Sequence, residues 1–175
     1  MSVYKSCDKV PYTISIQFDA NCVLNYDEMF RRRNYINRVS HHISVKYVGY
    51  EEKLTNKKQL IILQALKELR INKDPLIICG FNVMKSKNLF FDKLLYLEIK
   101  NSNYIKNIHF KVIELLHEET DIFLSSDLSS YVPHISCGRF VDDMSLRDLN
   151  DNFQTIVINH WDMVLHSSMK EIKIL

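Results

Sequence analysis

Residues 132–141 read VPHISCGRFV and residues 42–48 read HISVKYV, so the tripeptide His-Ile-Ser occurs twice, 92 positions apart. Each copy opens a stretch in which apolar and polar residues alternate, which is typical of a half-buried β-strand. Side chains two residues apart in a strand project from the same face, about 7 Å apart. We therefore expect His42 and Ser44 on one face of the first strand, with Ile43 facing the core, and the same arrangement in the second copy.

The second copy offers the side chains of His134 and Ser136. Two such pairs facing each other would surround an anion with imidazole and hydroxyl groups. Seven histidines and 15 serines in 175 residues give about 0.6 His-x-Ser matches by chance. A third match, at residues 166–168, falls in an expected hairpin turn and is interpreted as accidental, and His41 is set aside because its side chain should face away from Ser44. The repeated tripeptide in strand-like context predicts a two-histidine active site.

The rest of the chain supplies the other elements of an α+β domain. Further strands are expected at residues 12–18, 75–84, 89–100, 153–158, 161–165 and 172–175. Amphipathic helices are expected at residues 56–71, with Asn56 as N-cap, and at 104–118, with a short helix or ordered loop at 25–40 and a helical turn at 146–152. This order predicts mostly antiparallel sheets backed by two helices.

Length and composition restrict the possible functions. The chain has 175 residues, 46% of them apolar, and a formal net charge of +2, which suits one domain spanning residues 1–175 and argues against a general nucleic-acid coat protein. Its three glycines stand far apart, which excludes the glycine-rich phosphate loops. Four cysteines without CxxC spacing indicate free thiols in a reducing compartment. With no signal-peptide core and no membrane-length apolar run, a cytoplasmic location is expected.

The proline before the second tripeptide and the Gly138-Arg139 pair after it make that copy the more specific of the two. Together the copies resemble the H-x-[T/S]-x signatures of the two-histidine (2H) phosphoesterases. That superfamily includes LigT-like RNA ligases and cyclic phosphodiesterases and viral 2′,5′-phosphodiesterases. The likeness covers most of the chain, which departs from the commoner pattern by using serine where threonine is frequent. The resemblance implies two pseudo-symmetric lobes, each an antiparallel sheet backed by helix, with a central cleft between them.

The resemblance also implies a reaction that needs no metal and no cofactor. One of His42 and His134, in its neutral form, would remove a proton from the attacking hydroxyl, and the other, protonated, would donate to the leaving oxygen. Ser44 and Ser136 would bind the non-bridging phosphate oxygens. Which histidine is the base depends on the linkage that is cut and stays open.

Two further residues are candidates for substrate binding. Lys46 is expected to share the face of the first histidine and Phe140 that of the second, provided that the strand stays regular past Gly138. Lys46 would then meet a second phosphate and Phe140 would stack on a base; the alternatives are an exposed strand lysine and a core aromatic. The basic run at residues 31–33 is either a solvated helix face or a ligand-steering one.

A 2′–5′-linked or cyclic nucleotide is the favoured substrate. A compact domain of near-neutral charge suits a signalling nucleotide such as 2′,3′-cGAMP, or 2-5A, better than long RNA. Composition typical of an AT-rich genome fits a viral source, and the resemblance then implies an immune-evasion enzyme. Two alternatives remain: an RNA-end enzyme that opens 2′,3′-cyclic phosphates or forms 2′-5′ RNA linkages, and a module that sequesters a nucleotide without cleaving it. The expected partner is a nucleotide or short oligonucleotide, with no membrane and no obligate protein partner.

Overall fold

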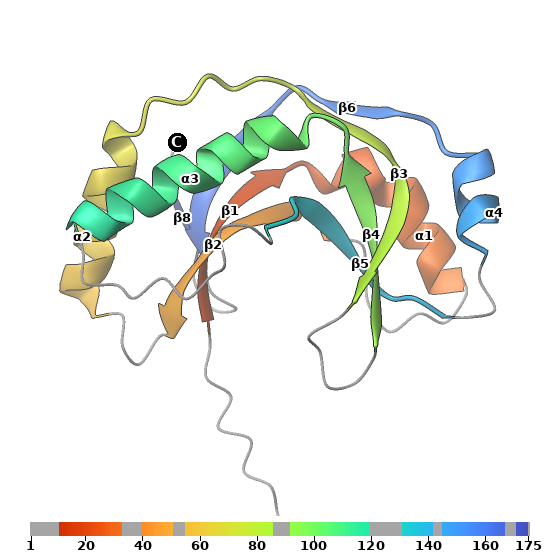
Figure 1. Ribbon diagram of the computed structural model, residues 1–175, viewed down its shortest axis with the longest axis horizontal. Helices are drawn as coiled ribbons and strands as arrows, with labels where there is room; N and C mark the ends of the chain where they lie inside the picture. The colour runs from red at the N-terminus through yellow and green to blue at the C-terminus, as the bar shows by residue number, and fades with distance from the viewer. Residues whose placement is uncertain are drawn as a thin grey trace, which may run out of the picture.

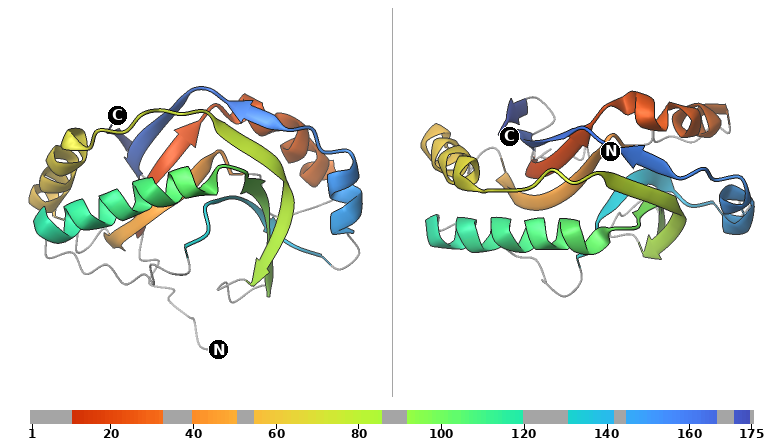
Figure 2. Two further views of the ribbon diagram at one scale, coloured as in Figure 1. Left: turned by 45° about the horizontal axis from the view of Figure 1, so that its top comes forward. Right: turned by 90° about the horizontal axis from the view of Figure 1, so that it is seen from above.

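The computed structural model describes residues 11–32, 40–50, 55–85, 92–119, 131–141, 145–166 and 171–174. Within these ranges the chain forms two four-stranded sheets whose paired strands are all antiparallel, together with helices (Figures 1 and 2). The predicted α+β class with antiparallel sheets is confirmed.

The first sheet has the strand order β2-β1-β7-β8. Its strands are β1 (Pro11–Phe18), β2 (His42–Tyr50), β7 (Trp161–His166) and β8 (Glu171–Lys173). The alternation in β1 determines which face is buried, because Ile14 and Ile16 are both fully buried and lie two residues apart. The sheet joins the beginning of the described chain to its end, since β7 pairs with β1.

The second sheet has the strand order β5-β4-β3-β6. Its strands are β3 (Leu76–Lys85), β4 (Lys93–Ile99), β5 (His134–Arg139) and β6 (Ile156–Ile158). The predicted pairing of residues 75–84 with 89–100 is confirmed by the β3–β4 register. The three C-terminal strands are divided between the sheets, so each sheet combines early and late parts of the chain.

Helices cover both sheets. They are η1 (Ala20–Val23), α1 (Leu24–Arg32), α2 (Asn56–Glu68), α3 (Ser102–Glu119) and α4 (Leu146–Asp151). The N-cap of α2 is Thr55 and not Asn56 as predicted, because the Thr55 hydroxyl accepts the N–H of Lys58. Figure 1 shows α2 and α3 at the end of the molecule near β1 and β2, and α1 and α4 at the opposite end near β3. The side chains of the basic run at 31–33 lie outside the described residues.

One cluster of buried apolar side chains joins both sheets and the helices. At its edge α4 is fastened to β3, where Asn150 accepts the N–H of Phe81 at 2.7 Å and donates its amide to the carbonyl of Phe81 at 3.0 Å. A Cβ added to Gly80 would lie 2.7 Å from the Asn150 side-chain oxygen. Glycine is therefore required at this position for a close approach rather than for a phosphate loop.

Candidate active site

The two His-Ile-Ser tripeptides lie at the start of two edge strands, since β2 ends the first sheet and β5 ends the second. The middle residues, Ile43 and Ile135, are fully buried in the core cluster. Because neighbouring residues in a strand point to opposite faces, the histidine and serine of each tripeptide project from the other side. The term histidine face is used below for this side of the sheets, which carries His42, Ser44, His134 and Ser136.

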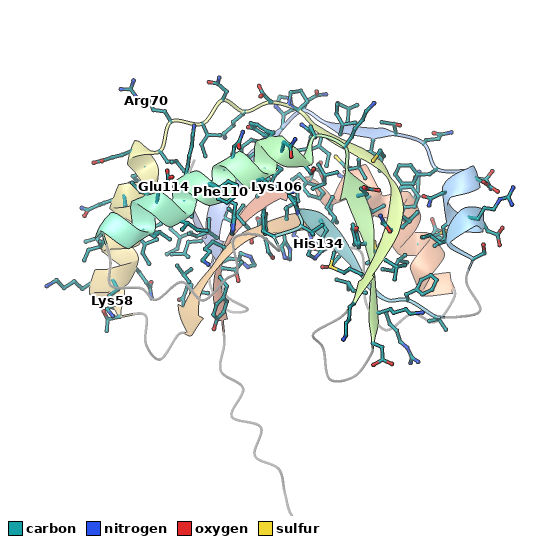
Figure 3. The ribbon with its side chains drawn as sticks, in the orientation of Figure 1. Lys58, Arg70, Lys106, Phe110, Glu114 and His134 are labelled. Atoms are coloured by element: carbon teal, nitrogen blue, oxygen red, sulfur yellow. The ribbon has the colours of Figure 1, made fainter. Side chains whose placement is uncertain are left out.

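Hydrogen bonds hold the two edge strands next to each other. The backbone N–H of Ser40 donates to the carbonyl of Ser136 at 2.8 Å, and the Tyr131 hydroxyl donates to the carbonyl of Ser44 at 2.9 Å. Each bond therefore joins the segment that leads into one histidine to the serine of the other tripeptide. Figure 3 shows His134 near the middle of the molecule, where β5 begins.

A β-bulge follows the first tripeptide. Ser44 lies opposite Ser15 and Lys46 opposite Ile14, so that Val45 is an extra residue in β2. A bulge shifts the side chains that follow it to the other face of the strand. Because Ile14 is fully buried on the core face, Lys46 also lies on that face, and the predicted shared face with the first histidine is wrong.

The burial of Lys46 reflects this change of face. Lys46 is only 4% exposed, and burial lowers its pKa. His109 of α3 lies near this lysine. Burial lowers the pKa of His109, and the charge of Lys46 lowers it further. The hydrogen bond from His109 Nδ1–H to the carbonyl of Val45, at 2.6 Å, acts in the opposite direction and raises the pKa of His109. On the histidine face the next position belongs instead to Tyr47, which is 41% exposed and lies opposite Thr13.

A second bulge follows the other tripeptide, with Cys137 as the extra residue. The backbone of Gly138 has φ +107°, a conformation that favours glycine, which explains the glycine of this motif. The strand is therefore not regular past Gly138. Phe140 packs against the core, with its N–H donating to the carbonyl of Lys93 at 3.0 Å, while Arg139 takes the position on the histidine face. The prediction that Phe140 shares the face of His134 required a regular strand and is therefore wrong.

His42 is held through its Nδ1 atom, which lies 2.7 Å from the hydroxyl of Ser40. This contact leaves Nε2 to face a ligand. Burial lowers the pKa of His42 to about 4, and the charges of His166, His41 and His134 add to the shift. The imidazole of His42 is therefore neutral at pH 7.

His134 is held by a backbone carbonyl. Its Nδ1–H donates to the carbonyl of Val132 at 2.7 Å, so its Nε2 is also left for a ligand. Burial lowers the pKa of His134, but the carbonyl opposes the shift because it stabilises the imidazolium form. The two imidazoles thus share one face but differ in what surrounds them.

A third imidazole, that of His166, belongs to the same face and was missed by the sequence argument. His166 is the last residue of β7 and not part of a turn. Its Nε2 lies 2.8 Å from the hydroxyl of Ser15, and its ring centroid lies 5.2 Å from that of His42. Because its serine partner comes from β1, the His-x-Ser pattern at 166–168 could not reveal it. The signal in the sequence is the strand expected at residues 161–165, which continues for one more residue.

A hollow of about 600 Å³ adjoins this face. Gln17 lies directly opposite His42 in β2 and Asp162 in β7, and both Gln17 and Asp162 line the hollow. Lys73 and His160 line it as well, and Lys73 Nζ forms an ion pair with Asp162 at 3.1 Å. A volume of this size lies in the range of small-molecule sites.

Within the described ranges, no group of three or more histidine, cysteine or acidic side chains is arranged to hold a metal ion. The cysteines at positions 22, 79 and 137 are free thiols. The described helices include none that is long and apolar enough to cross a membrane.

The sequence matches no protein-family model and none of the curated proteins. The fold, in contrast, matches solved structures over nearly the whole chain. Escherichia coli LigT complexed with 3′-AMP aligns with a TM-score of 0.61 at 9% identity, covering 96% of this chain and 97% of that one. The chain has the LigT fold.

Two further structures agree with this match. E. coli LigT in its apo form aligns with a TM-score of 0.57 at 7% identity, covering 96% of both chains, and a crystal structure described as a phosphoesterase aligns with a TM-score of 0.56 at 9% identity, covering 95% of this chain and 94% of that one. The fold that the resemblance implied is thus confirmed. Because a fold hosts many activities, the chemistry has to be argued from the site residues.

Proposed function

We propose that this protein is a phosphodiesterase that cleaves nucleotide phosphodiesters by acid–base catalysis between His42 and His134. One observation carries the proposal. Two identical tripeptides lie on adjacent edge strands that are joined by the Ser40–Ser136 and Tyr131–Ser44 hydrogen bonds, so both imidazoles project from one face. Two imidazoles on one face, one neutral and one protonated, are the groups that this chemistry requires.

The reaction needs one proton acceptor and one proton donor. The neutral imidazole removes the proton from the attacking hydroxyl, which is either water or the ribose hydroxyl beside the phosphate. That oxygen forms a bond to phosphorus while the bond from phosphorus to the leaving oxygen breaks. The imidazolium transfers its proton to the leaving oxygen. A 2′–5′ linkage carries its own nucleophile on the neighbouring ribose hydroxyl, so acid–base help is sufficient for its cleavage.

Ser44 and Ser136 bind the non-bridging phosphate oxygens in this proposal. Each serine lies two residues beyond its histidine on the same face, and each carbonyl is held by the segment leading to the other histidine. Hydroxyl donors fixed in this way stabilise the charge that develops on the phosphoryl oxygens. They replace the backbone donors that glycine-rich loops provide in other proteins.

The substrate we favour is a signalling nucleotide with a 2′–5′ or cyclic linkage, such as 2′,3′-cGAMP or 2-5A, cleaved in viral evasion of host immunity. The hollow that begins at Gln17, directly opposite His42, offers space for a nucleoside next to the reacting phosphate. Lys73 and His160 at its rim supply hydrogen-bond donors. A net charge of +2 suits a small ligand better than long RNA.

Incubation with three substrates tests the proposal. The protein is incubated with 2′,3′-cGAMP, 2-5A and a 2′,3′-cyclic mononucleotide, and the products are resolved by chromatography. Cleavage of either of the first two supports the signalling substrate. Opening of the cyclic mononucleotide alone would indicate an enzyme that acts on RNA ends. Tight binding in equilibrium dialysis without any turnover would show that the protein sequesters a nucleotide and does not cleave it.

The rate of cleavage is expected to be unchanged by EDTA, because imidazole and hydroxyl groups perform every step of the proposed mechanism. The measurement compares kcat before and after dialysis against the chelator, and again after Mg²⁺, Mn²⁺ or Zn²⁺ is added back. An absolute requirement for one of these ions would contradict the mechanism.

The pH profile of kcat/KM is expected to peak on the acidic side of pH 6.5. Burial lowers the pKa of both histidines, that of His42 to about 4, so the singly protonated pair is most populated below the ordinary histidine pKa of 6.5. The rate should rise as the pH passes about 4, where the base loses its proton, and fall as the pH passes the pKa of the acid. A peak above pH 7.5 with the same diester substrate would refute this expectation.

A further inference from the structure

The third imidazole of the histidine face has no step in the proposed mechanism. His166 pairs with Thr13 of β1, so β1 separates it from His42 in β2. The two rings nevertheless lean toward each other, with centroids 5.2 Å apart and planes inclined at 67°. An edge-on contact of this kind orients both rings.

A buried hydroxyl anchors His166 in this contact. Ser15 is fully buried, and its Oγ lies 2.8 Å from Nε2 of His166. Leaving a buried hydroxyl without a partner costs free energy, so the Ser15–His166 hydrogen bond is maintained. Ser15 lies directly opposite Ser44 in the register, which places the anchor beside the serine proposed to bind phosphate.

The surroundings of the two reacting histidines differ in the charge that they favour. His134 donates to a backbone carbonyl, which stabilises its protonated form. Among the residues that the structure describes, the ionisable groups that act on His42 are all imidazoles: His41 from the segment before β2, His166 from β7 and His134 from β5. Gln17, directly opposite in β1, is uncharged. Every charge that these groups acquire therefore opposes a proton on His42.

We propose that His166 is a positioning residue for His42: it holds the ring and disfavours its protonated form, so that His42 acts as the general base and His134 as the general acid. The assignment of base and acid rests on the proposed phosphodiesterase activity, whereas the effect of His166 on His42 does not. The same ring contact holds His42 in place and disfavours its protonated form, because it covers the ring of His42 and brings a like charge close to it.

The depressed pKa of His42 agrees with this role. Its largest cause is burial, and the next is the charge of His166, whose ring contacts that of His42. An imidazole with a pKa of about 4 stays neutral across the physiological range and is ready to accept a proton. Environments that push the pKa values of two groups apart are the means by which proteins divide the roles of acid and base.

Titration of His42 by NMR tests the positioning role without any substrate. In the His166→Ala variant the pKa of His42 is expected to rise by about one unit or more, because both burial and the like charge are lost. His166→Phe keeps a ring in place and should give a smaller rise, and it serves as the second variant if the alanine variant does not fold. Lys58→Ala, which removes an exposed side chain of α2, is the control and should leave the titration unchanged. An unaltered or lowered pKa in both His166 variants would overturn the proposal.

Leaving groups of different basicity test the division of roles. A nitrophenyl phosphodiester needs little help from an acid, because nitrophenolate leaves without a proton. His134→Ala is therefore expected to lose about tenfold or less on this substrate but about a hundredfold or more on the natural diester, whereas His42→Ala should lose equally on both. The opposite pattern would reverse the assignment.

The His166→Ala variant should also have about a tenfold lower kcat, with the acidic limb of its pH profile moved to higher pH. An acidic limb that stays in place would count against the role of His166 even if cleavage is observed. If no diester is cleaved by the wild-type protein, the proposed function fails, and the NMR titration still decides whether His166 controls His42.

Discussion

Replacing His134 by alanine is expected to lower the turnover of the phosphodiester about a hundredfold or more, and His42→Ala should do the same, while each variant keeps its fold. Loss of either imidazole removes a proton-transfer group from the transition state, which is worth about two to four orders of magnitude. Both side chains project from the histidine face, and the isoleucines between them and the serines form the buried part of each tripeptide. Turnover is measured by chromatography, and the fold by circular dichroism and thermal unfolding.

An exposed residue outside the site provides the control for these variants. Lys58 is exposed on α2, so Lys58→Ala should keep wild-type turnover and unfold at the same temperature. If His42→Ala or His134→Ala retained more than about a tenth of the wild-type kcat, the imidazoles would not perform the proton transfers and the two-histidine mechanism would be wrong.

The second large effect concerns the serines. Ser136→Ala and Ser44→Ala are each expected to lower kcat about a hundredfold, the lower end of what loss of one fixed donor to a developing oxyanion costs. The effect should fall on kcat more than on KM, because the hydrogen bonds strengthen as charge gathers on the phosphoryl oxygens. Steady-state kinetics on the cleaved diester separates the two parameters.

Threonine at the same positions is the matched control. Ser44→Thr and Ser136→Thr retain the hydroxyl, and the added methyl group is tolerated in a strand, so both variants should keep at least about a third of the wild-type kcat. Threonine variants as poor as the alanine variants would show that bulk at these positions matters rather than the hydroxyl. Alanine variants with wild-type kcat would remove the serines from phosphate binding.

Most strands were predictable because their evidence is local. Alternation over residues 12–18 and 42–48, and the apolar runs of the β3–β4 hairpin, depend only on which side chains face the core. The same alternation placed each histidine and serine on one face, since the intervening isoleucines have to be buried. The α+β class followed from the order of these elements.

The face of Lys46 and of Phe140 could not be predicted, because each lies beyond a bulge. A bulge inserts one residue into one strand of a pair, and whether it occurs depends on the partner strand, which is distant in sequence. Alternation extended through Val45 or Cys137 therefore gives the wrong face. On the histidine face, Tyr47 and Arg139 each stand one residue later in the chain than a regular strand would predict.

The two His-Ile-Ser tripeptides, the faces they expose and the class of fold follow from the sequence, because they depend on residues that are near one another in the chain. The contact between β2 and β5, the bulges that turn Lys46 and Phe140 away, and the approach of His166 to His42 are visible only in the folded chain. These features arise from pairing between segments far apart in sequence. Such pairing is selected by burial of the shared core, which no local pattern specifies.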